Sequence, residues 1–322
     1  MNLSIGLTTN ASYKKVRWLA TLAKETRLYR IWIGEDIDSL HNIFTLTSIF
    51  LLKTSFTKVG IGITSPLIRN ITTIARAAAG LIELDSEERF ILGLGIGGLQ
   101  DLSKKGLVIK NPLQILRNAD DILKRIWFGE KVTSKEGFVL DGYSARSKLK
   151  IPIYFGARGP KLLELAGEIA DGVIISGPKS YLEKATNIVK KGLEKSKNPY
   201  RNFNIVVWLP TVLIKDGKGI AIAKEVVSII ISDTPKKVLE LSGIDDVRIR
   251  KVRDAILKFG VKKASELVTE DLIRDFSISG NARQICEELK SFKEFGVDEV
   301  VFGPPYGLNW QSSIVNVLEA WK

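Results

Sequence analysis

The sequence predicts a single (β/α)8 TIM barrel that spans residues 1–322. Two observations predict this fold. Eight short apolar segments recur along the chain, and an amphipathic segment with helical spacing follows each of them. The apolar segments have apolar residues on both faces, as parallel strands buried between helices do. A doubly wound open sheet is the alternative fold for the same alternation.

The expected strands are short and alternate with the expected helices. The strands are residues 3–9, 30–35, 58–65, 90–97, 151–157, 172–177, 203–214 and 297–303. The helices are residues 12–27, 40–54, 71–85, 112–128, 160–170, 179–196, 217–231 and 310–321. Two segments interrupt this order and are expected to be insertions. Residues 129–150 indicate a short strand pair or an excursion, and the charges at helical spacing in residues 232–280 predict additional helices.

The composition excludes several classes of protein. A hydrophobic fraction of 45% and a charged fraction of 26% are ordinary for a soluble globular protein. No apolar run reaches the roughly 18 residues that span a bilayer, and the N-terminus lacks the pattern of a signal peptide. Cys286 is the only cysteine, so no internal disulfide can form. We therefore expect a cytoplasmic protein that does not bind membranes.

Histidine and charge limit the chemistry further. His41 is the only histidine, so a Ser-His-Asp triad is excluded unless His41 is its base. His41 and Cys286 alone cannot form a structural zinc site, and we expect no metal. The net charge is +12, but the basic residues are scattered and no nucleic-acid-binding motif accompanies them. The charge fits either a lysine-rich surface or an anionic small ligand better than it fits nucleic acid.

In a TIM barrel the active site lies at the carboxyl ends of the strands, so functional residues are expected at these ends. Several expected strands end in glycine, which lets the backbone approach a ligand closely. Residues 93–98 match the dinucleotide fingerprint G-x-G-x-x-G, but that motif requires a helix to begin at its glycines. Here the next helical pattern begins near Pro112. We therefore interpret Gly97 and Gly98 as part of the barrel mouth.

The segment Gly156-Ala157-Arg158-Gly159 is the best candidate for an anion site. Pro160 follows it at the expected first position of a helix, where proline is favoured. The free N–H groups and the positive end of that helix attract a phosphate, and the Arg158 guanidinium is suited to bind one. The alternative is a tight loop with a surface arginine. The next expected strand ends similarly, at Ser176-Gly177.

Carboxylates cluster after the second expected strand, at Glu35, Asp36 and Asp38. A carboxylate at a barrel mouth can transfer a proton or bind substrate, so Glu35 and Asp36 are the candidate catalytic residues. The alternative is that Asp36 or Asp38 forms the N-cap region of the next helix. His41, just inside that expected helix, is more typical of a surface residue. Trp208, near a strand end, is expected in the core or as the wall of a site for a flat aromatic ligand.

Several segments together resemble the coenzyme F420-dependent methylenetetrahydromethanopterin reductases of the bacterial-luciferase-like superfamily. The resemblance runs over nearly the whole chain. It is carried by residues 58–70 (KVGIGITSPLIRN), 91–98 (ILGLGIGG), 111–137 (NPLQILRNADDILKRIWFGEKVTSKEG), 151–177 (IPIYFGARGPKLLELAGEIADGVIISG) and 276–307 (FSISGNARQICEELKSFKEFGVDEVVFGPPYG).

The resemblance implies an enzyme that transfers a hydride between reduced coenzyme F420 and a small substrate, with methylenetetrahydromethanopterin or a related pterin as the expected substrate. It also implies a bulge on the third strand with a non-proline cis peptide, which falls at Gly62–Ile63. The deazaflavin ring is expected against the bulge residues Gly62, Ile63 and Thr64 and against Gly97–Gly98. Its phosphate is expected at Gly156–Gly159 and Ser176–Gly177.

Members of this family are commonly homodimers or larger, so the resemblance implies at least a homodimer here. Apolar residues on the early helices, such as Phe44, Ile49 and Phe50, are candidate contacts between protomers. The alternative for these three residues is burial inside one protomer.

The sequence departs from the family at two places. The reductases carry a glutamate on the first strand, where this chain has Gly6, and usually Asp-His after the second strand, where this chain has Glu35-Asp36. Two other functions therefore remain open. One is an FMN-dependent monooxygenase of the same superfamily, and the other is a flavin- or deazaflavin-binding protein without turnover.

Overall fold

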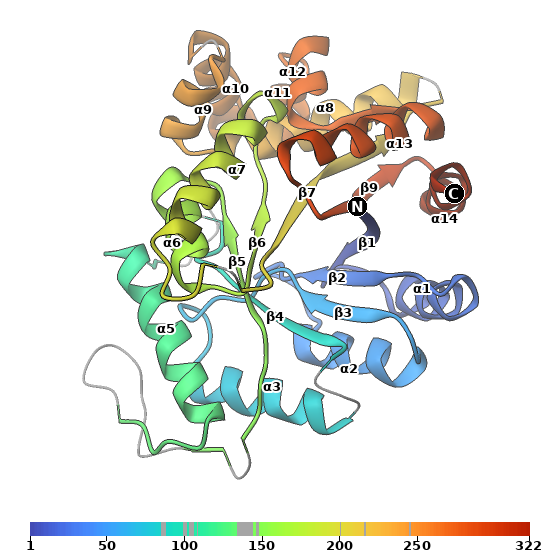
Figure 1. The fold of residues 1–322 in the computed structure, drawn as a ribbon. Helices are drawn as coiled ribbons and strands as arrows, with labels where there is room; N and C mark the ends of the chain where they lie inside the picture. The colour runs from blue at the N-terminus through green and yellow to red at the C-terminus, as the bar shows by residue number, and fades with distance from the viewer. Residues whose placement is uncertain are drawn as a thin grey trace.

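A computed structural model describes residues 1–84, 88–98, 102, 106–107, 109–133, 144–145, 148–199, 201–215, 217–244 and 246–322. Within these residues eight parallel strands close into a barrel (Figure 1). Strands β1 to β7 pair in chain order, β7 pairs with β9, and β9 pairs with β1. The closed order confirms the predicted TIM barrel and excludes the doubly wound open sheet.

Each barrel strand coincides with an expected one, although the last continues four residues further than predicted. The strands are β1 (Asn2–Thr8), β2 (Arg30–Gly34), β3 (Lys58–Ile61), β4 (Phe90–Leu94), β5 (Ile153–Ala157), β6 (Gly172–Ile175), β7 (Asn204–Leu213) and β9 (Glu299–Gly307). The eight expected helices are α1 (Tyr13–Thr26), α2 (Ile43–Lys53), α3 (Ile71–Leu84), α5 (Pro112–Trp127), α6 (Pro160–Ile169), α7 (Lys179–Glu194), α8 (Gly217–Asp233) and α14 (Trp310–Trp321).

Additional elements lie between α8 and β9. They are α9 (Lys236–Ser242), α10 (Asp246–Phe259), α11 (Val261–Ser265), α12 (Glu270–Phe276), β8 (Ile278–Gly280), α13 (Ala282–Ser291) and the 3-10 helix η1 (Phe292–Phe295). Figure 1 shows α9 to α12 gathered beside α8 at one side of the barrel. These helices have a hydrophobic cluster of their own, which includes Val227, Val252 and Phe276. In the other interruption, residues 129–150, the expected strand pair falls largely on residues 134–143 and 146–147, which lie outside the described residues.

Local sequence signals explain where several helices begin. Pro112 and Pro160 occupy the first positions of α5 and α6, where the missing proline N–H costs no hydrogen bond. Helix α13 begins with a capping box, in which Asn281 and Gln284 each accept a hydrogen bond from the other's backbone N–H. The prolines remove an N–H group that would have no partner inside the helix, and the capping box satisfies two such groups, so these residues favour helix starts at these positions.

The interior of the barrel is filled below its carboxyl end. A cluster of buried side chains occupies the middle: Trp32, Ile91, Tyr154, Ile174, Val206 and Val301, with Ile63 and Trp208 packed against it. At the amino end Glu299 pairs with Arg30 and accepts a hydrogen bond from Trp32 Nε1 at 2.6 Å. Burial raises the pKa of Glu299, and the charge of Arg30 opposes that effect. The space for a ligand therefore lies at the carboxyl end.

The helices next to the barrel also test the proposed contacts between protomers. Phe50 is fully buried and Phe44 is 8% exposed, and both belong to the hydrophobic core of the protomer. Ile49 is partly buried against the same core. The interpretation of Phe44 and Phe50 as contacts between protomers is therefore wrong, because packing inside the protomer already covers them.

None of the described helices is long and apolar enough to cross a membrane.

Candidate active site

A cavity of about 630 Å³ lies at the carboxyl ends of the strands. Every expected site residue except Thr64 lines it. These residues are Glu35, Asp36, Gly62, Ile63, Gly97, Gly98, Gly156, Ala157, Arg158, Gly159, Ser176 and Gly177. A smaller cavity of about 210 Å³ adjoins the first and shares Glu35, Asp36 and Ile63 with it. Residues that are far apart in the sequence therefore meet in one place, as the parallel topology requires.

The bulge after β3 has the expected backbone. The Gly62–Ile63 peptide is cis, as the resemblance implies. The Ile63 side chain fits over glycines of the neighbouring strands: an added Cβ would lie 2.8 Å from Ile63 at Gly95 and 2.7 Å from it at Gly156. These glycines therefore make room for Ile63, and both also line the cavity.

Arg158 lies where β5 and β6 end side by side, with Ala157 paired to Ile175. Arg158 Nε donates a hydrogen bond to Ser176 Oγ at 2.7 Å, and Nη1 lies 3.1 Å from Asp233 Oδ2. Both side chains of this ion pair are about one quarter exposed. Among the residues that the structure describes, Nη2 of Arg158 has no hydrogen-bond acceptor. The guanidinium is thus held at the cavity wall with one nitrogen available.

The start of α6 adds backbone donors beside Arg158. Gly159 is the N-cap residue, and no side chain caps this helix end. Apart from Gly159 and its two chain neighbours, no described residue has a heavy atom within 4 Å of where a Cβ at Gly159 would be, so there is open space beside the start of the helix. The first N–H groups of a helix have no partner within it, and they carry partial positive charge. The predicted combination of a helix end and Arg158 is therefore present at the cavity.

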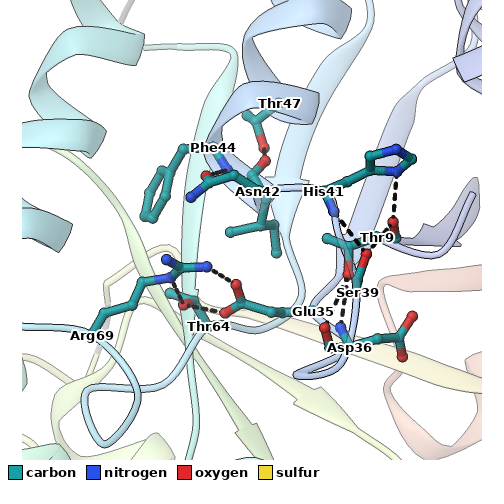
Figure 2. A network of polar contacts seen from close by, with 11 residues as sticks. Thr9, Glu35, Asp36, Ser39, His41, Asn42, Phe44, Thr47, Thr64 and Arg69 are labelled. Carbon is teal, nitrogen blue, oxygen red and sulfur yellow. Dashed lines mark hydrogen bonds and ion pairs between the residues drawn. The ribbon is translucent and has the colours of Figure 1, made fainter.

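Glu35 is held by an ion pair. Arg69 donates to Glu35 Oε1, and Thr64 Oγ1 donates to Glu35 Oε2 at 2.6 Å (Figure 2). The Glu35 side chain is only 6% exposed. Thr64 is itself fully buried and lines neither cavity, so its contact is with Glu35. This network connects the end of β2 to the segment after β3.

Asp36 points away from Glu35, as Figure 2 shows. Its backbone N–H donates to Thr9 Oγ1 at 2.9 Å, which fixes the main chain, and its Oδ2 accepts only a long hydrogen bond of 3.4 Å from the Asn10 N–H. Asp36 is half-buried and lines both cavities. Of the two candidate carboxylates, Asp36 is the one that remains open to a ligand.

The start of α2 excludes one of the two alternatives for this segment. Its N-cap is Asn42, whose side chain accepts a hydrogen bond from Phe44 N at 2.9 Å. The interpretation of Asp36 or Asp38 as an N-cap residue is therefore wrong. His41 lies before α2 and not inside it, with Nδ1 3.0 Å from Thr9 O and its ring 4.5 Å from that of Tyr13.

Comparisons with known proteins decide the family. The sequence model of the luciferase-like monooxygenases matches residues 2–299. The chain belongs to the luciferase-like monooxygenase family. It is 30% identical to the 5,10-methylenetetrahydromethanopterin reductase of Archaeoglobus fulgidus, over 98% of this chain and 96% of that protein. It is also 30% identical to the reductase of the same name from Methanolobus tindarius, over 93% of each chain.

A solved structure agrees with these relatives. The coenzyme F420-dependent tetrahydromethanopterin reductase from Methanopyrus kandleri is 26% identical to this chain and superposes with a TM-score of 0.84. The match covers 100% of this chain and 99% of that one. The whole length of this luciferase-like chain is therefore accounted for by the fold of these enzymes.

Trp208 occupies the centre of the barrel mouth in this family member. Its indole ring meets glycines from three sides: an added Cβ would lie 2.5 Å from the ring at Gly6, 3.0 Å at Gly62 and 2.3 Å at Gly303. A side chain at position 6 therefore cannot coexist with Trp208 in this position. Gly6 thus leaves the space that the ring of Trp208 occupies, and no local pattern in the sequence signals this contact.

The sequence did not indicate that α8 contributes to the cavity. Asp233 comes from the end of α8, and Val226 and Ile230 of the same helix line the apolar side of the cavity. Arg69 was not expected because nothing in its surroundings in the sequence marks it. Within the described ranges, no three acidic, cysteine or histidine side chains lie close enough together to hold a metal ion.

Proposed function

We propose that this chain is a coenzyme F420-dependent oxidoreductase, which transfers a hydride between reduced F420 and methylenetetrahydromethanopterin or a related pterin. The observation that carries the proposal is the 30% identity, over almost the full length, to enzymes named for that reduction. The cavity at the carboxyl ends of the strands supports it, because this is where TIM-barrel enzymes bind their substrates.

The residues at the cavity fit a deazaflavin with a phosphate. Arg158 and the first turn of α6 offer donors for the phosphate, and the open space at Gly159 leaves room for it. Ile63 at the bulge and Ile174 at the end of β6 provide an apolar surface for the ring. The bound deazaflavin supplies the hydride, and the protein orients it and excludes water.

Asp36 is the residue that we assign to the substrate. Its carboxylate is open to both cavities, and a carboxylate in that position can accept a hydrogen bond from a polar edge of the substrate. Glu35 has a different role. Since its two oxygens are bound by Arg69 and Thr64, it holds the segment after β3 in position beside the bulge.

The test is a titration of the purified protein with oxidised F420 and with FMN, followed by a turnover assay. We expect saturable binding of F420 and reduction of methylenetetrahydromethanopterin when reduced F420 is supplied. Binding of FMN with no binding of F420 would contradict the proposal. It would instead indicate a flavin-dependent monooxygenase, the activity for which the matched family is named. Binding of F420 without turnover of any tested pterin would instead indicate a carrier protein.

We also propose that the protein is cytoplasmic and assembles at least as a homodimer. With Phe44 and Phe50 buried, exposed apolar residues such as Leu52 and Phe56, each 64% exposed, replace them as candidate contacts near α2. Light scattering at micromolar concentration tests this directly. A monomer mass of about 36 kDa under those conditions contradicts the proposal.

A further inference from the structure

The indole ring of Trp208 forms the end of the cavity that faces the barrel interior, and its neighbours leave it no space to move further into the barrel. Trp208 packs on the buried cluster of the barrel interior, and the glycines at positions 6 and 303 leave no space between their backbones and the ring. Gly34 also lies beside it, with an added Cβ 3.6 Å from the ring. Because β1, β2 and β9 surround it at these distances, the ring has a fixed orientation.

The cavity has two sides with different character. The residues assigned to the cofactor, Arg158, Gly159 and Ile63, come from the segments that follow β3 and β5. The remaining wall comes from β1, β2, β7 and β9, with Thr8, Asp36 and Pro304 as lining residues. Trp208 comes from β7 on this second side and reaches across the mouth to the bulge after β3, where an added Cβ at Gly62 would lie 3.0 Å from the ring.

Hydride transfer requires the accepting carbon to lie over the face of the donor ring, about 3–3.5 Å from the donating atom. A cofactor seated on the β3 and β5 side therefore places its reaction partner on the Trp208 side. We propose that Trp208 is the platform on which the flat ring of the substrate lies, and that it determines which substrates bind. The inference rests on the function proposed above.

The platform also defines the chemistry of the substrate. Trp208 fills the space in which a side chain at position 6 of β1 would stand, so no carboxylate can extend from that position toward the substrate. The substrate must then present a flat, uncharged face to the indole. The carboxylate of Asp36 would contact the edge of that flat ring. A pterin has both features, because its fused ring is planar and its amide and amino groups lie at its edge.

The experiment compares Trp208→Leu and Trp208→Phe with the parent protein. For Trp208→Leu we expect the KM for methylenetetrahydromethanopterin to rise about tenfold or more, the range of a lost aromatic stack. The Kd for F420 should stay within about twofold of the parent, and Trp208→Phe should fall between the two. An unchanged KM, or an equal rise in the Kd for F420, overturns the proposal. If the parent protein itself binds no F420, the proposed function fails and not the platform.

Fluorescence gives a second readout that does not depend on turnover. The pterin should change the tryptophan fluorescence of the parent protein, and Trp208→Phe should lose that change. Trp321→Phe is the matched control, since Trp321 lies in the last turn of α14 beside Lys290, and it should keep the change. Loss of the signal in the control variant, or its retention in Trp208→Phe, contradicts the proposal.

If Trp208→Leu does not fold, a variant that keeps the tryptophan but displaces its ring provides the test. Gly6→Ala adds a methyl group 2.5 Å from the ring and should push the indole up into the cavity, which raises the KM for the pterin. Gly80→Ala on α3 is its control, because no heavy atom lies within 4 Å of the added methyl group there. Equal KM values for the two variants would overturn the proposal.

Discussion

Arg158 Nη1 and Asp233 Oδ2 lie 3.1 Å apart and form an ion pair across the wall of the cavity. The pair joins the end of β5 to the last residue of α8, and Nη1 also donates to the Asp233 backbone oxygen at 3.2 Å. An arginine that is already oriented loses less side-chain entropy when an anion binds. The carboxylate therefore positions the guanidinium and, at the same time, partly neutralises it.

Replacement of Arg158 by alanine should weaken the binding of F420 by about 1–3 kcal/mol, the contribution of a hydrogen bond to a charged group. The measurement is a titration of the oxidised cofactor. Arg117→Ala is the matched control, because Arg117 forms a comparable pair with Glu168 at 2.8 Å on α5 and α6 and lines neither cavity. If Arg158→Ala binds F420 as tightly as Arg117→Ala, the phosphate does not lie at Arg158.

Replacement of Asp233 by asparagine separates positioning from charge. The amide can still accept a hydrogen bond from Arg158, but it no longer neutralises the guanidinium. We expect the affinity for F420 to be retained or increased, and the gain to shrink at high salt because the added attraction is electrostatic. A tenfold loss of affinity in Asp233→Asn would show that the carboxylate itself is needed for the site.

Glu35 and Arg69 should prove to be partners in stability. Glu35→Gln leaves the partly buried Arg69 without its countercharge, which should lower the free energy of unfolding by about 1–3 kcal/mol. The double variant Glu35→Gln, Arg69→Gln should lose less than the sum of the two single variants, because both single changes remove the same pair. Denaturant unfolding of the four proteins measures this, and strictly additive losses would exclude the coupling.

Asp36→Asn should affect turnover and not stability. The carboxylate makes only a long hydrogen bond within the protein, so its replacement leaves no buried partner unsatisfied. We expect a lower kcat or a higher KM for the pterin, with the unfolding midpoint and the Kd for F420 close to those of the parent. Full activity in Asp36→Asn would mean that the substrate is held or protonated by another group or by solvent.

The pH dependence of stability should carry a contribution from Asp120 on α5. Burial raises the pKa of this carboxyl group to about 6, although the charge of Lys124 lowers it. Lys124 Nζ lies 2.9 Å from Asp120 Oδ1 and also donates a hydrogen bond to Ile169 O, but the effect of burial on the carboxyl group exceeds that of this ion pair. Because the pKa is higher in the folded state, folding takes up a proton between roughly pH 4 and 6, and the associated stability is lost as the pH rises through 6.

Asp120→Asn removes that loss. The difference in free energy of unfolding between the variant and the parent should grow in favour of the variant as the pH rises from about 4.5 to 7. The growth should be at most about 3 kcal/mol. Asp121→Asn, on the exposed face of the same helix, is the control and should show no such change. A difference between Asp120→Asn and the parent that is constant over this range would contradict the assignment.

The barrel could be predicted from the sequence because its signals are local. Each strand is a short run with apolar residues on both faces, and Pro160 marks the start of its helix without reference to any distant residue. Strand β8 was missed because three residues are too few to show a period. The start of helix α13 could have been predicted from the sequence, since Asn281 and Gln284 have the spacing of a capping box.

The site was predictable only in position. The strand ends converge in any parallel barrel, so residues such as Arg158 and Gly177 could be assigned to one mouth. Their partners could not be assigned, because Arg69 and Asp233 meet Glu35 and Arg158 across 34 and 75 residues of sequence. No periodicity reports such contacts, and only the folded backbone determines them.

The filled interior also bears on the order of events in a catalytic cycle. From the pair of Arg30 and Glu299 up to Trp208, the described side chains fill the barrel below the cavity, so ligands reach the cavity from the carboxyl end of the barrel. Two ligands that share one entrance cannot exchange independently if one lies behind the other. The inner ligand has to arrive first and depart last, so initial-rate kinetics should show a compulsory-order ternary complex, in which the product of the outer ligand dissociates before that of the inner one.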